Sequence, residues 1–329
     1  MPRASGPDLR LVENPAVLTD DLAFSAAQAV IATAIAAAKL AGRGDEKAAD
    51  QAAVDALRTA LNAMPIKGRI VIGEGERDEA PMLYCGEEVG TQEGPEIDIA
   101  LDPLEGTTLT AKAMANAIAV MAFAPRGGLL HAPDTYMDKI AIGPGFDDDV
   151  IDLDLSIKDN VHSLAKAKGE KVHDIGVCVL DRPRHSQIVD DLRAIGARIH
   201  LISDGDVCGV INCTNPDTGI DMYVGQGGAP EGVLAASALK CVGGQFQGRL
   251  VFRNDDEKKR ADNVGITDLK RKYLLNDLVC ADAIFVATGV TSGSMLSGVR
   301  NGGGYTHTHT LIMNSATKNV SEIRMKSPT

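Results

Sequence analysis

Two acidic residues follow a single apolar stretch at a spacing that could hold a cation. Segment 97–108 begins as an apolar run, reaches Asp102, continues with Pro103, and has Glu105 three residues after the first acid. Pro103 should end the strand, and the turn after it would direct both carboxylates and the Thr107 hydroxyl into one small volume. Two carboxylates so close repel each other unless a cation lies between them. Oxygen ligands of this kind suit Mg²⁺ or Mn²⁺ bound together with a phosphate group.

A second apolar run ends in the same way. Residues 69–73 are typical of a buried strand, and Glu74 follows at once, with Glu76 and Asp78 behind it. Ligands of α/β sheets bind beyond the carboxyl ends of strands, so two strands that both end in acids are expected to meet at one site. Taken alone, the second segment is more typical of a solvated acidic loop. Beside segment 97–108 it favours a shared cation site.

A glycine pair precedes a further acid. Gly227 and Gly228 follow an expected strand, and Glu231 falls in the first turn of the helix that opens there. Glycines before a helix N-terminus expose backbone N–H groups, which bind anions. A Gly-Gly pair alone is usually just a turn, but its place after a strand and before an acid predicts that Glu231 faces the same volume.

The elements that must position these residues follow two patterns. Residues 1–18 are irregular and expected to be mobile, and 19–155 contain Ala-rich helices followed by strands, an α+β arrangement. In 156–329 strands and helices alternate, which predicts a mostly parallel, doubly wound sheet and an α/β class overall. The expected helices span about 20–41, 45–63, 157–168, 183–195, 206–212, 230–241 and 255–273. The expected strands span about 69–73, 97–101, 117–123, 136–142, 176–180, 197–202, 219–224, 245–252, 283–287, 306–313 and 319–325.

Length and composition limit the possible functions. With 329 residues the chain should form two lobes, and an apolar fraction of 44% is enough for a packed core. The formal net charge of −12 disfavours binding to nucleic acid or to anionic membranes. Six scattered cysteines without a Cys-x-x-Cys pair indicate reduced thiols and a cytoplasmic protein. The Ala-rich segment 26–41 is too short and too weakly apolar to cross a membrane, so a buried helix is expected there.

These motifs, with others in the same order, resemble the lithium-sensitive, metal-dependent sugar and inositol phosphatases. Within that superfamily the sequence is most similar to the class II fructose-1,6-bisphosphatases of bacteria, from about residue 20 to the end. The segments that carry the resemblance are 42–50, 71–84, 102–107, 132–139, 182–185, 203–207 and 227–232. The resemblance implies a layered α-β-α-β-α sandwich. One departure is Glu46, where many relatives have Lys, which leaves any cationic role at that place in doubt.

The resemblance also implies a metal site. Its ligands would be Glu74, Asp102, Glu105 and Glu231, with Asp50 either a ligand or a partner of Thr107. Two divalent ions about 4 Å apart can activate a water, neutralise a phosphoryl group and assist the leaving group. A Thr107 hydroxyl that passes its proton to Asp50 could accept one from that water. Metal-activated water is favoured over a covalent phosphothreonine, because no dedicated base for Thr107 is visible.

A bisphosphate substrate needs a second pocket for the phosphate that does not react. Arg182 and Arg184 flank Pro183, which fixes the backbone there, and Arg donates two hydrogen bonds to phosphate in a fork. The resemblance adds Tyr136 to this pocket. It also assigns sugar-hydroxyl contacts to the segment 204–206, although a helix N-cap at either acid is compatible. The full substrate-binding set is Glu105, Gly106, Thr107, Tyr136, Arg182, Pro183, Arg184, Asp204, Gly205, Asp206 and Gly228.

The function implied is hydrolysis of the 1-phosphate of fructose-1,6-bisphosphate, with Mn²⁺ or Mg²⁺ as cofactor. Sedoheptulose-1,7-bisphosphate is a close second substrate, since it differs mainly by one hydroxylated carbon. Two alternatives stay open: an inositol or nucleotide monophosphatase of the same superfamily, and an inactive sugar-phosphate-binding regulator. The arginine pair speaks against the first alternative, and the intact acids with Thr107 speak against the second. The family also leads us to expect a homo-oligomer, a dimer or a tetramer, with no nucleic-acid or membrane partner.

Overall fold

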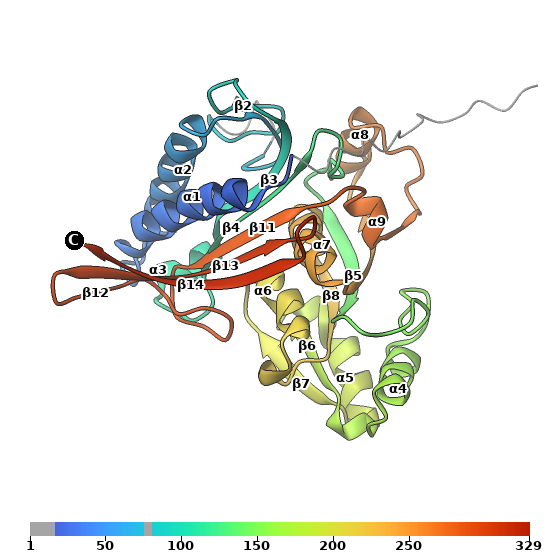
Figure 1. The fold of residues 1–329 in the computed structure, drawn as a ribbon. Helices are drawn as coiled ribbons and strands as arrows, with labels where there is room; N and C mark the ends of the chain where they lie inside the picture. The colour runs from blue at the N-terminus through green and yellow to red at the C-terminus, as the bar shows by residue number, and fades with distance from the viewer. Residues whose placement is uncertain (1–16, 76–80) are drawn as a thin grey trace, which may run out of the picture.

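Two β-sheets form the framework of the computed structural model, which describes residues 17–75 and 81–329 (Figure 1). The first sheet has eight strands in the order β12-β13-β11-β4-β3-β1-β2, with β14 paired to β13, and the second has six in the order β10-β9-β5-β8-β6-β7. The strands of the first sheet are β1 (Lys67–Ile72), β2 (Glu88–Val89), β3 (Glu96–Glu105), β4 (Ile118–Pro125), β11 (Ile284–Gly289), β12 (Arg300–Gly302), β13 (Tyr305–Asn314) and β14 (Asn319–Pro328). Those of the second are β5 (Tyr136–Ile142), β6 (Gly176–Leu180), β7 (Arg198–Ile202), β8 (Met222–Gly228), β9 (Gln245–Val251) and β10 (Lys272–Leu274).

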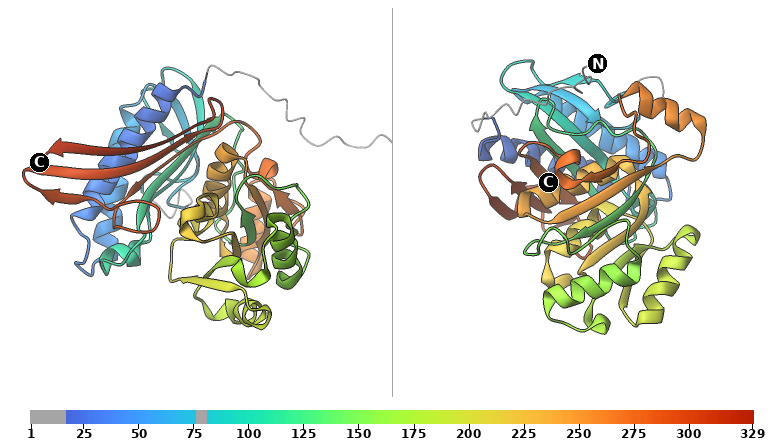
Figure 2. Two further views of the ribbon diagram at one scale, coloured as in Figure 1. Left: turned by 60° about the horizontal axis from the view of Figure 1, so that its bottom comes forward. Right: turned by 90° about the vertical axis from the view of Figure 1, so that its right-hand side faces the viewer.

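Helices alternate with the sheets in layers. The helices are α1 (Asp20–Ala38), α2 (Glu46–Asn62), α3 (Thr107–Ala111), α4 (Ile157–Lys168), α5 (Ser186–Ile195), α6 (Asp206–Ile211), α7 (Ala229–Val242), α8 (Asp255–Asn263) and α9 (Leu275–Leu278). One apolar cluster joins α1 and α2 to the first sheet, a second joins α6 and α7 to both sheets, and a third joins α4 and α5 to the second sheet. Figure 2 shows these layers in two further views. The expected α/β class and the α-β-α-β-α layering are therefore confirmed.

Helix α1 is the Ala-rich helix expected from the sequence. The Thr19 hydroxyl accepts a hydrogen bond from the Leu22 N–H and caps its start. By length and composition alone α1 could cross a membrane, but half of its apolar window is buried inside the protein. Its small side chains pack against α2 and the first sheet, which makes it a core helix of the first layer.

The second sheet is mixed, so the expectation of a mostly parallel sheet is wrong. Strand β6 runs parallel to β7 and β8, whereas the β8–β5, β5–β9 and β9–β10 pairs are antiparallel. The alternation of strands and helices after residue 156 does not reveal why the sheet is mixed. Strand β5 comes from earlier in the chain and lies between β8 and β9, which would otherwise be candidates to pair.

Two expected element ends are also wrong. Strand β3 does not stop at Pro103 but continues to Glu105, with a register shift between Asp102 and Glu105. Proline is tolerated at such a bulge because a backbone N–H is not needed there. The charged helix expected over 255–273 ends at Asn263, because Gly265 with φ +83° breaks it and β10 follows.

Both sheets combine strands from early and late parts of the chain. Strands β11 to β14 extend the sheet of β1 to β4, and β5 lies in the second sheet. The division into lobes 19–155 and 156–329 stays a prediction. Residues 1–18 are expected from the sequence to be mobile. Residues 1–16 of this segment lie outside the described residues, and Leu18 is buried.

A buried carboxylate, Asp98, forms ion pairs near the start of β3, at the opposite end from Glu105. The Asp98 carboxylate is fully buried and accepts hydrogen bonds from Arg69 (2.9 Å) and from the Gly127 N–H (2.6 Å). The Arg126 guanidinium lies 3.6 Å away. The side chains of Arg69 and Arg126 are 41% and 29% exposed, so water can still reach both guanidinium groups if the carboxylate is removed. The Gly127 N–H would then lose its acceptor, and both arginines would lose their buried partner.

We therefore expect Asp98→Ala to lower the free energy of unfolding by about 1–3 kcal/mol, the cost of leaving hydrogen-bond donors without their acceptor. Urea denaturation followed by circular dichroism would measure the change. The matched control is Asp255→Ala, which removes an exposed carboxylate paired only with Lys258 and should leave stability nearly unchanged. Equal stability of the Asp98→Ala variant and the parent would contradict the structural role of this pair.

Candidate metal and phosphate site

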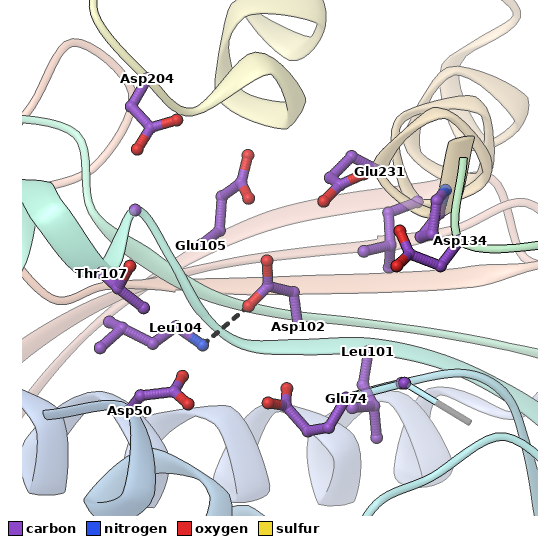
Figure 3. Close-up of a pocket in the computed structure, with 15 residues that line it drawn as sticks. Asp50, Glu74, Leu101, Asp102, Leu104, Glu105, Thr107, Asp134, Asp204 and Glu231 are labelled. Atoms are coloured by element: carbon purple, nitrogen blue, oxygen red, sulfur yellow. Dashed lines mark hydrogen bonds between the residues drawn. The ribbon is translucent and has the colours of Figure 1, made fainter. Parts of the chain in front are cut away.

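A cavity of about 390 Å³ gathers acidic side chains from separate layers of the fold (Figure 3). Its acids come from α2, from the loop after β1, from β3, from the segment before β5, from the loop before α6 and from α7. They are Asp50, Glu74, Asp102, Glu105, Asp134, Asp204 and Glu231. The predicted ligand set therefore lines one cavity, as do Gly106 and Thr107. Glu76 and Asp78 lie outside the described residues.

The bulge in β3 sets the directions of two acids. The Leu104 N–H donates to Asp102 Oδ1 at 2.9 Å, and the Val207 N–H donates to Glu105 Oε1 at 3.3 Å. Gly106 then adopts φ +93°, a left-handed conformation that glycine takes without strain, and α3 begins at Thr107. The turn after β3 thus brings both carboxylates and the Thr107 side chain to the cavity wall.

Glu231 completes a cluster with these two acids. One carboxylate oxygen from each of Asp102, Glu105 and Glu231 lies within 4.8 Å of the others. A Cβ on Gly228 would lie 1.9 Å from Glu231 Oε2, so only glycine leaves room for this carboxylate over the start of α7. Glu231 Oε2 is buried and accepts no hydrogen bond from the residues that the structure describes. An unpartnered buried carboxylate oxygen is an open ligand position for a cation.

Asp102 also belongs to a second group of acids. Burial raises the pKa of Glu74 to about 8, with further contributions from the charges of Asp102 and Asp50. Burial raises the pKa of Asp50 as well. In Figure 3, Asp50 and Glu74 project into the cavity on one side of Asp102, and Glu105 and Glu231 lie on the other. Two adjoining groups of acids therefore share Asp102.

The crowding leaves these carboxylates poorly stabilised as anions. Desolvation raises the pKa of Asp102, Glu105 and Glu231, and neighbouring carboxylates raise them further. A divalent cation would remove both penalties at once, because it replaces lost hydration and reverses the sign of the nearest charge. The ligand atoms are carboxylate oxygens, which suit Mg²⁺ or Mn²⁺. The residues present therefore fit the expected metal.

The expected arginines lie beside the cavity. Arg182 lies 3.6 Å from Asp204, which lines the cavity, and donates a hydrogen bond to the Ser203 carbonyl. Arg184 donates to the Gln226 carbonyl through Nε (3.1 Å) and Nη2 (2.7 Å). Its Cζ lies 4.9 Å from the centre of the Tyr136 ring. Arg184 and Tyr136 are thus in contact, whereas Arg182 makes its ion pair on the Asp204 side. Pro183 begins a short 3₁₀ helix that leads into α5.

Asp206 has a different environment from Asp204. Its carboxylate forms a buried ion pair with Lys139 at 2.7 Å, lies 3.4 Å from the Tyr223 hydroxyl, and is not among the cavity-lining residues. The alternative role of Asp204 or Asp206 as a helix N-cap is not the one observed, because Gly205, with φ +82°, is the N-cap of α6. Asp206 therefore contributes to the packing around the cavity and does not line it.

Sequence reasoning missed two residues of this site. Asp134 lines the cavity, and the acid that precedes β5 was a signal for it. Lys139 is 1% exposed in the middle of β5, and a lysine inside an apolar strand indicates a buried anionic partner. That partner, Asp206, lies 67 positions away in the sequence, so no local pattern could identify it.

Comparison with known proteins agrees with this geometry. Residues 20–327 match the family described as bacterial fructose-1,6-bisphosphatase, glpX-encoded. This chain belongs to the class II fructose-1,6-bisphosphatase family. It is 41% identical to D-fructose 1,6-bisphosphatase class 2/sedoheptulose 1,7-bisphosphatase of Synechococcus sp. (strain JA-3-3Ab), over 92% of this chain and 94% of that protein. Identity and coverage are the same for fructose-1,6-bisphosphatase 1 class 2 of Escherichia coli (strain K12).

Membership of the class II fructose-1,6-bisphosphatase family makes this chain a phosphoric monoester hydrolase. It confirms the resemblance drawn from the sequence, and the match extends across both sheets rather than over a single motif. The acidic cavity can hold a metal ion, and the arginines beside it can hold a phosphate.

The raised pKa of Glu74 predicts how pH acts on the metal-free protein. In the folded state Glu74 keeps its proton up to a pKa of about 8, while the unfolded chain releases it near 4.5. Between these values the folded state binds more protons, so raising the pH disfavours it. We therefore compare the wild type with Glu74→Gln in EDTA. The difference in Tm, wild type minus variant, should decrease as the pH is raised from about 5 to 8.

Added Mn²⁺ should reverse this trend, because the cation binds the ionised carboxylates and the metal-dependent gain in Tm should grow with pH. Differential scanning fluorimetry at several pH values would measure both. A Tm difference in EDTA that does not change with pH would contradict the raised pKa of Glu74.

Proposed function

We propose that this protein hydrolyses the 1-phosphate of fructose-1,6-bisphosphate to give fructose 6-phosphate and phosphate. One observation carries the proposal: a cavity of crowded carboxylates adjoins a group of arginines through Asp204 and Arg182. The cavity suits a reacting phosphate held with metal, and the arginines suit a second phosphate. Membership of the class II fructose-1,6-bisphosphatase family supports the same substrate.

The metal ligands proposed are Asp50, Glu74, Asp102, Glu105 and Glu231, and the metal is Mn²⁺ or Mg²⁺. The two groups of acids that share Asp102 support two neighbouring cation positions. Bound there, divalent cations supply charge neutralisation for the phosphoryl group and activation of the attacking water. The protein contributes a rigid frame, since the acids come from a strand bulge, two helices and a strand end.

Thr107 and Asp50 are the residues proposed to handle the proton of the attacking water. Both line the cavity, and Thr107 is the first residue of α3, where its hydroxyl is carried by a helix rather than a loop. The hydroxyl can accept a proton and pass its own to Asp50. Burial raises the pKa of Asp50, which makes this carboxylate a better proton acceptor than an exposed aspartate.

The remaining residues bind and orient the sugar. Asp204 lines the cavity and can accept hydrogen bonds from sugar hydroxyls, while its neighbour Arg182 faces the second phosphate. Asp206 acts indirectly, because its ion pair with Lys139 supports the turn at Gly205. Gly228 has no side chain, and its backbone lies next to the Glu231 carboxylate. Its backbone is therefore proposed to contact substrate bound beside Glu231.

Sedoheptulose-1,7-bisphosphate is proposed as a second substrate. The Synechococcus relative carries that activity in its name, and the two substrates place a phosphate at each end of a polyol chain. Inositol and nucleotide monophosphates are disfavoured, since they leave Arg182 and Arg184 without a phosphate. Phosphate release from each compound, measured with EDTA and metal add-back, separates these substrates from an inactive regulator.

The state of the protein in the cell is also a proposal. We infer a cytoplasmic homo-oligomer, a dimer or a tetramer, that has no nucleic-acid or membrane partner. The net charge of −12 supports the lack of a nucleic-acid or membrane partner, and six scattered cysteines without a Cys-x-x-Cys pair support the cytoplasmic location. Size-exclusion chromatography with light scattering would give the oligomeric state directly.

Thr107→Ala should lower kcat by roughly 100-fold or more, the usual contribution of one acid–base group, while metal binding survives. The matched control is Thr108→Ala on the same turn, because Thr108 does not line the cavity. Steady-state kinetics and calorimetric Mn²⁺ titration provide the two readouts. Rapid quench with labelled substrate should find no phosphoenzyme in the wild type, and trapping one would overturn the direct attack of water.

Arg184→Ala should raise KM for fructose-1,6-bisphosphate roughly tenfold and change kcat much less, because the lost contact is to the phosphate that does not react. Arg193→Ala on α5, where the arginine is exposed and paired with Asp190, provides the control. An unchanged KM for Arg184→Ala would remove this arginine from the proposed pocket.

A further inference from the structure

A second arginine, besides Arg184, lies against Tyr136. Arg253 follows β9, and its Cζ lies 4.6 Å from the centre of the Tyr136 ring, closer than the 4.9 Å of Arg184. Strand β5 runs between β8 and β9, with Tyr136 opposite Gly228 on one side and Val251 on the other. Arg253 therefore approaches the tyrosine from the end of β9, whereas Arg184 approaches it from the turn before α5 and is held by the Gln226 carbonyl of β8.

A buried carboxylate holds Arg253 in place. Glu257, in the first turn of α8, is 2% exposed and accepts hydrogen bonds from Arg253 Nε (2.5 Å) and from the Arg253 N–H (2.6 Å). It also accepts a bond from the Thr135 hydroxyl (3.1 Å), and Asn254 caps the helix that carries it. One carboxylate thus fixes both Arg253 and the residue next to Tyr136.

The arginine remains half exposed despite this anchor. Its side chain is 55% exposed, so the part of the guanidinium that does not contact Glu257 faces solvent. Glu257 is held ionised: burial alone would raise its pKa, but hydrogen bonds from Arg253 and Thr135 bring the pKa below its usual value. The anchor therefore orients Arg253 at one edge and leaves its other edge open.

Each of the donor groups that converge here has capacity for a further acceptor. Arg184 uses Nε and Nη2 on the Gln226 carbonyl, and Arg253 uses its Nε side on Glu257. Within residues 17–75 and 81–329, the Tyr136 hydroxyl makes no hydrogen bond. Glu257 offsets the charge of Arg253 only, so one positive charge beside the ring remains without an anionic partner among the ion pairs of the described residues. A phosphate dianion would supply that partner and accepts hydrogen bonds from guanidinium and phenol donors alike.

We propose that Arg253 binds the non-reacting phosphate of the sugar bisphosphate together with Arg184 and Tyr136, and that Glu257 is a positioning residue for Arg253. This inference rests on the proposed function. It adds Arg253, which lies just before α8, to a pocket otherwise built from β5 and the turn before α5. It makes the loop between β9 and α8 part of substrate recognition.

The first test compares two substrates. For Arg253→Gln loaded with Mn²⁺, KM for fructose-1,6-bisphosphate should rise about tenfold with kcat within twofold, since one charge-assisted contact to phosphate is lost. For fructose 1-phosphate, which lacks the second phosphate, kcat/KM should not change. The matched control is Arg271→Gln, which removes an arginine 4.9 Å from the Tyr273 ring and paired with Asp277 at 2.6 Å.

The second test isolates positioning from binding. Glu257→Gln keeps the size of the side chain but removes its charge, so KM for the bisphosphate should rise while fructose 1-phosphate turnover stays constant. Arg253→Lys should recover only part of the affinity, because an ammonium keeps the charge without the fork. Thermal denaturation of each variant checks that a KM change is not a loss of fold.

Calorimetric titration with fructose 6-phosphate tests Arg253 without turnover. The product retains the non-reacting phosphate, so Arg253→Gln should weaken its binding about tenfold. If the wild type binds fructose 6-phosphate but releases no phosphate from the bisphosphate, the proposed function is overturned. The role of Arg253 in phosphate binding is then decided by this titration alone. Unchanged binding by Arg253→Gln, or equal losses on both substrates, would overturn the role of Arg253.

Discussion

Repulsion between buried carboxylates is the constraint on which the rest of the structure depends. Asp102, Glu105 and Glu231 place oxygens within 4.8 Å of one another, and one buried oxygen of Glu231 has no hydrogen-bond partner in the described part of the chain. Such an arrangement disfavours ionisation of every member, as the raised pKa values show. The protein keeps it because a divalent cation turns the same crowding into a binding site, and phosphate chemistry follows from that cation.

The layered fold explains how the acids can be crowded and still held firmly. Asp50 comes from the helical layer on the outer face of the first sheet, Asp102 and Glu105 from that sheet, and Glu231 from the helix between the sheets. Each of these acids is carried by a packed helix or strand, with Asp102 and Glu105 both on β3, so the backbone at each acid is held by its layer. The second sheet then carries Tyr136 at the start of β5, which places the arginines beside the metal cavity.

Local sequence patterns predicted the parts of this site that lie on one element or at its end. The run around Asp102 and Glu105 and the glycines before Glu231 carry their signals within a few residues. The bulge that lets β3 pass through Pro103 was not predicted, because a proline ordinarily ends a strand. The position of β5 between β8 and β9, the Lys139–Asp206 pair and the approach of Arg253 to Tyr136 depend on contacts distant in the sequence, which no periodicity records.

Anomalous diffraction from crystals grown with Mn²⁺ tests the central claim most directly. The account predicts an anomalous peak enclosed by the carboxylates of Asp102, Glu105 and Glu231, at distances typical of oxygen ligands to this ion. An absent peak, with those three side chains turned away from one another in the refined structure, would contradict it.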